Sequence, residues 1–270
     1  MINSKIMKKY EEQYFANYEP VPYTLRDGYI LNIYPALVKE WALFENSIYI
    51  LTQDKNSIND ADIIRMSYLE FLYNLINYDI VKNGEDSKYR KMLLNVLVIT
   101  FKDEEGTLYS FDKYNDRICL SLYSDNEVKC RITAKDLKEI TEIIMRYNFI
   151  EYNDKQYSED ILRAVNDFVK LKSKNSRQPS LEEKKAYVIS KTGINFKDIN
   201  DMPYRLFDLI FSCNLGFDSF IGDKIIQGSY KYKVDEDIQH PLYAPKRDIL
   251  SEVFQDSDSI KQKVSQGAKA

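Results

Sequence analysis

Two stretches of this sequence share one pattern, and that pattern constrains the fold more than any other feature. Residues 58–71 (INDADIIRMSYLEF) align without gaps on residues 194–207 (INFKDINDMPYRLF), with Ile, Asn, Asp, Ile, Met, Tyr and Phe in common. Asn59 and Asn195 suit the first free amides of a helix, and an aspartate follows three residues later in both copies, where a carboxylate meets the positive helix end. Each copy is therefore predicted to begin with a short helix.

In each copy the helix pattern then starts again. Ser67 with Glu70 has the spacing of a capping box, and Pro203 suits the first position of a new helix. We therefore expect a short helix, a kink and a longer helix in each copy. A chance match is the alternative, which superposition of the two backbones tests. The kinks are predicted to be buried by the faces that carry the shared aromatic residues, Tyr68 and Phe71 in one copy and Tyr204 and Phe207 in the other.

The composition favours a helical protein with a proper core. Of the 270 residues, 44% are hydrophobic and only eight are Gly and seven Pro, which is typical of helices rather than of a loop-rich β protein. The formal net charge of -4 gives no general cationic field, so bulk attraction to nucleic acid or anionic membranes is not expected. The 22 tyrosines have two interpretations, namely amphipathic aromatics shared between core and interface, or the codon usage of a low-GC genome.

The residue types that commonly carry chemistry are sparse. Cys119, Cys130 and Cys213 are odd in number, widely spaced and set in apolar runs, which favours reduced core residues in a cytoplasmic protein over disulfides or a zinc site. His240 is the only histidine, which excludes triads and metal sites that need several imidazoles. The sequence contains neither a glycine-rich phosphate loop nor an apolar signal or membrane-spanning run. We therefore expect no catalytic centre, cofactor or metal site, and no membrane insertion.

The N-terminal part is predicted to be mostly helical. Residues 8–15 have the pattern of a short helix or docking arm, and the prolines of residues 20–23 predict an extended segment. Residues 89–101 are predicted to begin as a helix and, because their end is β-branched, to finish as a buried strand. Tyr34-Pro35 is predicted to open a long helix, whose core face carries Leu37, Trp41, Phe44, Ile48 and Leu51.

The hydrophobic period then changes from helical to alternating. Residues 107–111, 117–123 and 127–132 are short runs separated by turn residues, as antiparallel hairpins require. Thr133 with Asp136 forms a capping box behind them and predicts the next helix.

The C-terminal part is predicted to return to helices and then to lose its pattern. Helices are expected from Ser158, and from Ser180 with Glu183 as far as Thr192-Gly193. Residues 170–179 form the best linker candidate. From Gly216 the helical signal weakens, so we expect a strand or extended arm at 225–234 and a frayed tail at 257–270.

These segments predict a mostly helical α+β protein in which two helical halves flank a small antiparallel β-sheet. The expected division is an N-terminal arm at 1–19, an N-terminal helical half at 20–101, β hairpins at 102–132, a C-terminal helical half at 133–215, and an extended arm and tail at 216–270.

Residues 180–211 also have the outline of a helix-turn-helix, so a DNA-binding regulator is the alternative function. The helix that would read bases offers chiefly Arg205 and an acidic Asp208, and its apolar residues cover too much of it for a DNA groove. The same apolar excess favours packing against a partner polypeptide or a central place in the core. The candidate partner-binding residues are Trp41, Tyr68, Phe71, Tyr204, Phe207 and Phe211.

Several of these stretches resemble tail proteins of phages that infect low-GC Gram-positive bacteria. Residues 180–185, 192–199 and 202–207 are similar to one recurrent helical element of those proteins, and residues 132–148 to another. The resemblance implies a non-enzymatic tail-assembly chaperone or a tail or baseplate component, and it carries over no catalytic residue.

The same resemblance implies the setting and the partners. The implied partners are the tape-measure, tail-tube or baseplate proteins, and self-association of this chain is a further expectation. The charge and the lack of an apolar span predict contact with neither membrane nor nucleic acid. The implied location is the bacterial host cytoplasm during assembly and, for a structural component, the virion. The long first helix and the inserted hairpins fit the chaperone pattern less well, so chaperone and virion component stay open at this point.

Overall fold

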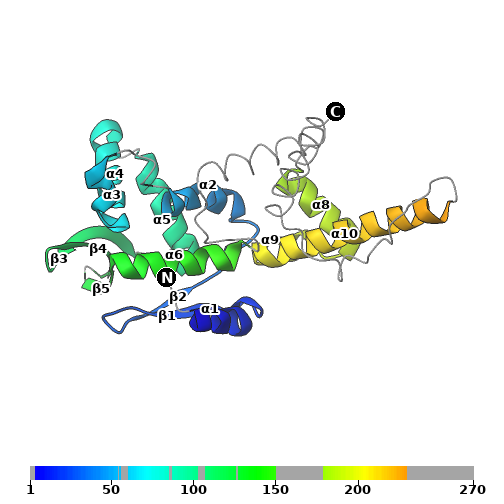
Figure 1. The fold of residues 1–270 in the computed structure, drawn as a ribbon, viewed down its shortest axis with the longest axis horizontal. Coiled ribbons are helices and arrows are strands. Elements are labelled where there is room, and N and C mark those ends of the chain that lie inside the picture. Colours follow the sequence, from blue (N-terminus) through cyan, green and yellow to red (C-terminus); the bar gives the residue numbers. More distant parts are fainter. Residues whose placement is uncertain are drawn as a thin grey trace, which may run out of the picture. The chain divides into compact units, whose positions relative to one another are not determined.

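In the computed structural model the chain forms two compact units. Unit 1 comprises Met1–Tyr152 with Asn195–Asp208, and unit 2 comprises Asn153–Ile194 with Leu209–Ala270. Figure 1 shows the elements in chain order from blue to orange. The structure describes residues 4–53, 55, 60–84, 87–102, 107–125, 127–149 and 179–229.

The N-terminus of unit 1 is a helix packed on its own chain. Helix α1 (Ser4–Tyr10) runs into a π-helical turn, η1 (Glu11–Phe15). The ring of Phe15 is 2% exposed and stacks on Tyr147 with centroids 4.5 Å apart. The predicted short helix is confirmed, and the stacking seats it in the core of unit 1.

A β-hairpin follows the arm. Strands β1 (Val21–Thr24) and β2 (Ile30–Ile33) pair antiparallel, with Val21 opposite Ile33. The prolines predicted only an extended segment at residues 20–23, and the pairing partner β2 was not predicted. Val21, Leu31 and Ile33 are buried, so one face of this short hairpin belongs to the core.

Helix α2 (Trp41–Thr52) begins later than predicted. Its stripe of Trp41, Phe44, Ile48 and Leu51 is buried as expected, but Leu37 lies ahead of the helix and forms an antiparallel bridge with Pro203. The helix predicted from Tyr34-Pro35 is therefore wrong over residues 35–40, because it begins only at Trp41. The reason is a backbone pairing with residues 200–204, in which the amide of Val38 donates to the carbonyl of Met202 at 2.9 Å. Residues 36–39 cannot make these bonds and helical bonds together.

Three helices follow α2 in the chain. Helix α3 (Ala61–Arg65) is short, and helix α4 (Tyr68–Asn83) starts at the predicted Ser67–Glu70 capping box and ends at Gly84, whose φ is +65°. Helix α5 (Lys88–Phe101) contacts both α2 and α4. These helices form most of the first helical half.

The predicted strand at the end of residues 89–101 is wrong, because α5 stays helical through Phe101. Val96, Ile99 and Thr100 are buried, and the Thr100 hydroxyl donates to the Val96 carbonyl at 2.7 Å, within the helix. β-Branched residues lose little by being helical when their side chains are already immobilised in a core. Packing against α2 and α4 therefore outweighs their preference for a strand.

The three predicted strands form one antiparallel sheet in the order β3-β4-β5. Strands β3 (Leu108–Tyr114), β4 (Arg117–Ser124) and β5 (Glu127–Ile132) confirm the alternating pattern. Asn115 and Asp116 have φ values of 48° and 60°, the left-handed backbone of a two-residue hairpin turn. Register places Leu120 opposite Ile132 and Leu122 opposite Cys130, and all four are buried.

Helix α6 (Ala134–Asn148) covers the core behind this sheet. It starts at the predicted Thr133–Asp136 capping box, and it contacts β5, β2 and α4 (Figure 1). Its buried face includes Leu137, Ile140, Ile144 and Tyr147.

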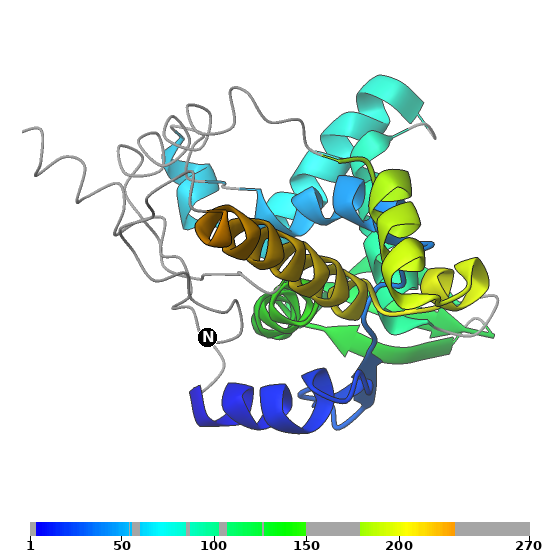
Figure 2. The same ribbon diagram turned by 90° about the vertical axis from the view of Figure 1, so that its right-hand side faces the viewer.

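The later described residues are helical. Helix α8 (Leu181–Thr192) begins at the predicted Ser180–Glu183 capping box and ends at Gly193, whose φ is +73°. Helix α9 (Phe196–Asn200) lies in unit 1, and α10 (Tyr204–Gly228) starts in unit 1 and continues into unit 2 as one unbroken helix (Figure 2).

Helix α10 corrects the expectation for the residues after Gly216. They stay helical to Gly228, so the predicted extended arm is wrong over 216–228, and the predicted boundary at 215 falls inside a helix. Hydrophobic residues at helical spacing outweigh the weak propensity of the glycines. The remaining five-part division stays a prediction. The predictions for residues 158–169, 170–178 and 230–270 lie outside the described residues.

The mostly helical α+β class is confirmed. In the part of the chain that the structure describes, none of the helices combines the length and the apolar character needed to cross a bilayer.

Candidate functional site

Most of the predicted partner-binding residues lie in the core of unit 1. Trp41 and Phe71 are each 4% exposed, Tyr204 is 9% exposed, and Phe207 is fully buried. Side chains this deep in their own unit have no surface left for a partner, so the structure gives these four a packing role. Tyr68 and Phe211 are half-buried.

The two copies of the repeated pattern contact opposite ends of α2. The Tyr68 hydroxyl donates to the carbonyl of Ile50 at 2.9 Å, near the C-terminal end of that helix. The Tyr204 ring stacks on Trp41, the first residue of the helix, with centroids 3.4 Å apart. Helix α2 therefore serves as a common support for both elements.

The local geometry of the two copies is similar. Both have a five-residue helix, a break, and a long helix that begins at the equivalent tyrosine. The Tyr68 and Phe71 rings lie 5.7 Å apart at 44°, and the Tyr204 and Phe207 rings lie 5.9 Å apart at 46°. These shared ring geometries are what a structural repeat predicts.

The caps of the two short helices differ, which corrects one prediction. Asn195 caps α9 as expected, by accepting from the amide of Asp198 at 2.9 Å. In the first copy the cap is Asp60, which accepts from the amide of Asp62 at 2.8 Å, and Asn59 lies outside the described residues. The helix of the first copy starts one residue later because Asp60 can accept the hydrogen bond from a backbone amide. The equivalent residue of the second copy is Phe196, which cannot.

Polar interactions, as well as the ring stacking, bind the second copy to the rest of unit 1. Lys39 pairs with Asp201 at 2.7 Å. The Arg205 guanidinium donates to the Arg146 carbonyl at 2.5 Å, and its carbon lies 5.7 Å from the centre of the Phe15 ring. Arg205 was the chief base-reading candidate of the helix-turn-helix alternative, and here it is engaged inside unit 1.

The part of α10 in unit 2 packs on α8 along one side. The Tyr187 hydroxyl donates to Asp218 at 2.7 Å, and Lys191 binds the other oxygen of the same carboxylate at 2.7 Å. The rings of Tyr187 and Phe211 meet edge to face, with centroids 5.5 Å apart. Phe211 and Asp218 therefore mark the side of α10 that faces α8.

An apolar stripe lies on the remaining side of α10. With about 100° between successive residues, Leu209, Cys213 and Phe220 point away from Phe211 and Asp218, Phe217 follows to one side, and Ile221 lies about 60° from Asp218 at the border of the stripe. Leu209 is 45% exposed and Ile221 is 52% exposed. The sequence prediction missed this surface because the helix was expected to end before Gly216. We call it the outer face of α10, and it comprises Leu209, Cys213, Phe217, Phe220 and Ile221.

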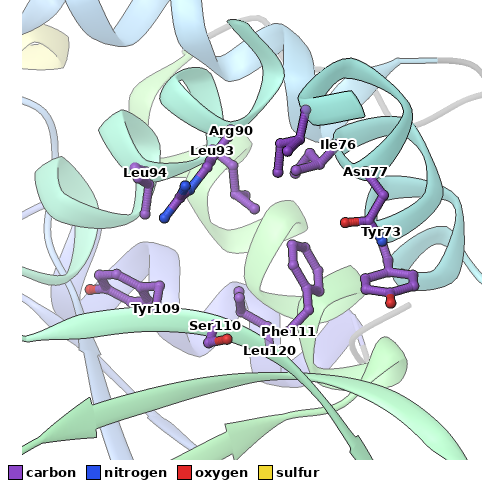
Figure 3. A pocket seen from close by; sticks show the side chains of 11 residues that line it. Tyr73, Ile76, Asn77, Arg90, Leu93, Leu94, Tyr109, Ser110, Phe111 and Leu120 are labelled. Atoms are coloured by element: carbon purple, nitrogen blue, oxygen red, sulfur yellow. The ribbon is translucent and has the colours of Figure 1, made fainter. Parts of the chain in front are cut away.

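A pocket of about 190 Å³ lies in unit 1 between α4, α5, β3 and β4 (Figure 3). Figure 3 shows Arg90 and Leu94 of α5 across the space from Tyr109, Ser110 and Phe111 of β3. Sequence reasoning did not find this pocket, because its lining comes from four elements whose packing no local pattern encodes. The lining combines polar Tyr73, Asn77, Arg90, Tyr109 and Ser110 with apolar Ile76, Ile80, Leu93, Leu94, Phe111 and Leu120.

The strongly perturbed titratable groups of unit 1 hold elements together. The hydroxyl of Tyr23 on β1 donates to Glu139 at 2.8 Å and to Asp136 at 3.2 Å, both on α6. Burial and these carboxylates raise the pKa of Tyr23 well above its ordinary value of 10. Asp136 also completes the capping box of α6 with Thr133, so the contact joins β1 to a helix start. Across the described ranges, His, Cys, Asp and Glu side chains do not gather in threes as a metal site needs.

Comparison of this chain with protein-family models, curated protein sequences and solved structures found no match.

Proposed function

We propose that this chain acts by binding other polypeptides during phage tail morphogenesis, as a tail-assembly chaperone or as a tail or baseplate component. The tail setting is supported by the resemblance of residues 132–148 and 180–207 to phage tail proteins. The binding function is supported by one structural observation, the outer face of α10. Its partners are tape-measure, tail-tube or baseplate proteins.

The outer face suits an amphipathic helix of a tail protein. Its apolar residues recur at steps of three and four, the spacing at which one helix packs its side chains between those of another. Asp223 is exposed on the same helix, so a basic residue beside the partner's apolar stripe would complement it. Leu209 and Ile221 leave about half of their surface in water, which a partner helix would remove at a gain of roughly 1 kcal/mol each.

Two linked measurements test this proposal. Mass spectrometry of purified virions beside the infected-cell lysate is expected to find the chain with tail proteins. Presence in the particle identifies a structural component, whereas a complex confined to the lysate identifies a chaperone. If the chain is found with tail proteins neither in the virions nor in the lysate, the tail assignment is overturned.

The binding surface is tested by two matched substitutions on α10. Ile221→Asp places a charge on the outer face and is expected to abolish the complex with the tail protein, because burial of an unpaired carboxylate is unfavourable. Ser219→Asp adds the same charge at an exposed position beside that face and is expected to leave the complex intact. Equal retention of the complex by both variants would exclude the outer face as the binding surface.

A further inference from the structure

We propose that the pocket between α4, α5, β3 and β4 binds a small aromatic carboxylic acid, with its carboxylate on Arg90, its ring against Phe111 and a hydroxyl at Asn77. The ligand class is that of para-hydroxyphenylacetate, in which one aromatic ring carries a short acidic arm and a hydroxyl opposite to it. This site goes beyond the proposed function, because none of its residues lies on the outer face of α10.

The size of the pocket fits one aromatic ring with short substituents. An apolar cavity of roughly 150 Å³ inside a protein is large enough to bind benzene. At about 190 Å³ the present pocket has room for the same ring and a few more atoms. Sites for drug-sized molecules enclose roughly 300–1,000 Å³, so the pocket selects a smaller ligand than these.

The middle of the pocket is apolar and contains an aromatic wall. Ile76, Leu93 and Leu120 line it and are buried. The Phe111 ring meets the Tyr73 ring edge to face, with centroids 5.7 Å apart, which restricts the orientation of Phe111. Figure 3 shows Phe111 rising from β3 into the space. A flat ring can pack on Phe111 in an offset arrangement, so we expect an aromatic ligand to bind better than an alkyl one.

The charge of the pocket selects an acid. Arg90 is the only charged side chain among the lining residues that the structure describes. It is exposed, and across the described residues it forms no ion pair. A guanidinium binds a carboxylate through two parallel hydrogen bonds. A ligand carboxylate can therefore pair with Arg90 while the ring of the ligand enters the apolar middle.

Hydrogen bonds at the start of α5 hold Arg90 beside α4. The Ser87 hydroxyl oxygen accepts from the Arg90 amide at 3.3 Å, and the same hydroxyl donates to Asp79 of α4 at 2.7 Å. The Tyr89 amide donates to the Asp79 carboxylate at 3.2 Å. The backbone that carries Arg90 is thus fixed at the pocket before a ligand binds, which lowers the ordering cost of binding.

Asn77 supplies the second polar end of the site. Figure 3 shows Arg90 and Asn77 on opposite sides of the space. The Asn77 side chain is half-buried, and its amide can both donate to and accept from a hydroxyl. A hydroxyl para to the acidic arm lies at the opposite end of the ring from the carboxylate. The arrangement therefore favours the para-hydroxy acid over the unsubstituted one.

The first test compares ligands on the full wild-type chain by NMR titration of its backbone amides. With para-hydroxyphenylacetate we expect saturable shifts at residues 76–94 and 109–120, with a Kd on the order of 1 mM or tighter. para-Hydroxyphenylacetamide has the same shape without the charge and is expected to bind at least about tenfold more weakly. Phenylacetate lacks the hydroxyl and is expected to bind about two- to tenfold more weakly.

A matched pair of substitutions then tests Arg90. Arg90→Gln is expected to weaken binding of para-hydroxyphenylacetate by about tenfold or more and to change binding of the neutral amide less than about twofold. Lys88→Gln removes the same charge at an exposed position of α5, about 200° around the helix axis from Arg90. It is expected to change binding of the acid less than about twofold.

The inference is overturned if the wild-type chain shows no saturable shifts, if the acid and its amide bind equally, or if phenylacetate binds as well as the hydroxylated acid. Equal weakening by Arg90→Gln and Lys88→Gln would overturn it too. Ile221→Asp on α10 is expected to bind the acid like the wild type. If tail proteins associate with the chain but the acid does not bind, this site is refuted and the proposed function stands. If the acid binds but no tail protein associates, the site stands and the tail assignment fails.

Discussion

The indole ring of Trp41 and the phenol ring of Tyr204 lie parallel, with centroids 3.4 Å apart and 3° between their planes. Trp41 opens α2 and Tyr204 opens α10, so the stack joins the start of one helix to the start of another that is distant in sequence. Both rings are buried. The pair holds the second copy of the repeated element in unit 1.

Removing this stack is expected to destabilise the protein strongly. Trp41→Ala leaves a cavity under Tyr204 and is expected to lower the free energy of unfolding by about 3–5 kcal/mol, measured by urea denaturation. Leu43→Ala on the same helix is the control, because Leu43 is 51% exposed and its loss should change that free energy by less than about 0.5 kcal/mol. A double-mutant cycle with Tyr204→Ala is expected to show a coupling of about 0.5–1.5 kcal/mol, and additive losses would contradict direct stacking.

Asp79 is expected to make stability depend on acidic pH. The Ser87 hydroxyl donates to its carboxylate at 2.7 Å, and this bond, with those from the Tyr89 amide and Asn83, lowers the pKa of Asp79. A carboxyl group with a lowered folded-state pKa stabilises the protein above its unfolded pKa of about 3.9, and that contribution is lost as the pH falls through the folded value.

The corresponding variant is Asp79→Asn, compared with the wild type by urea denaturation at several pH values. We expect a clearly lower urea midpoint at pH 7 and a difference that shrinks below about pH 4. Asp116→Asn, in the exposed β3–β4 turn, should follow the wild type throughout. A difference for Asp79→Asn that stays constant down to pH 2 would show that the carboxylate charge is not what Ser87 stabilises.

Tyr187 is expected to lose its proton at a higher pH than an ordinary tyrosine. Burial and the hydrogen bond to Asp218 raise the pKa of Tyr187 to about 12. Because this is above the ordinary value of 10, the neutral phenol stabilises the folded state fully below about pH 10, and the contribution is lost as the pH rises toward 12. NMR of ring-labelled tyrosine, assigned with Tyr187→Phe, measures the midpoint.

Asp218→Asn removes the carboxylate beside Tyr187 and is expected to lower that midpoint toward 10. Asp223→Asn, at an exposed position of the same helix, should leave it unchanged. A wild-type midpoint near 10 would mean that Tyr187 is not bound to Asp218 in solution, and the contact between α8 and α10 would need revision.

The helix starts were predictable because their causes are local. Ser67, Thr133 and Ser180 each accept a bond from the amide three residues on, and each capping box was found where the spacing predicted it. The β3–β5 strands were predictable for a similar reason, since alternation and turn residues act within a few positions. The same local rule placed the cap of α3 one residue early, at Asn59 instead of Asp60.

The candidate sites were less predictable. The residues chosen as partner-binding were chosen for being aromatic and apolar, and that property marks a core residue as well as an interface residue. The exposure of each side chain in the tertiary structure separates core from interface candidates, as in buried Phe207 and exposed Ile221. The pocket beside β3 had no sequence signal, because Arg90 and Phe111 come together only through the packing of α5 on the sheet.

By itself, the sequence determined the mostly helical α+β class, the capped helix starts and the three-stranded sheet, because these depend on hydrogen bonds and hydrophobic period within a few residues. The tertiary structure alone decided that residues 36–39 pair with residues 200–204, that the β-branched end of α5 is helical, and which aromatic side chains are buried. Each of those outcomes depends on atoms contributed by distant segments, whose packing and backbone bonds outweigh the local preference of any one stretch.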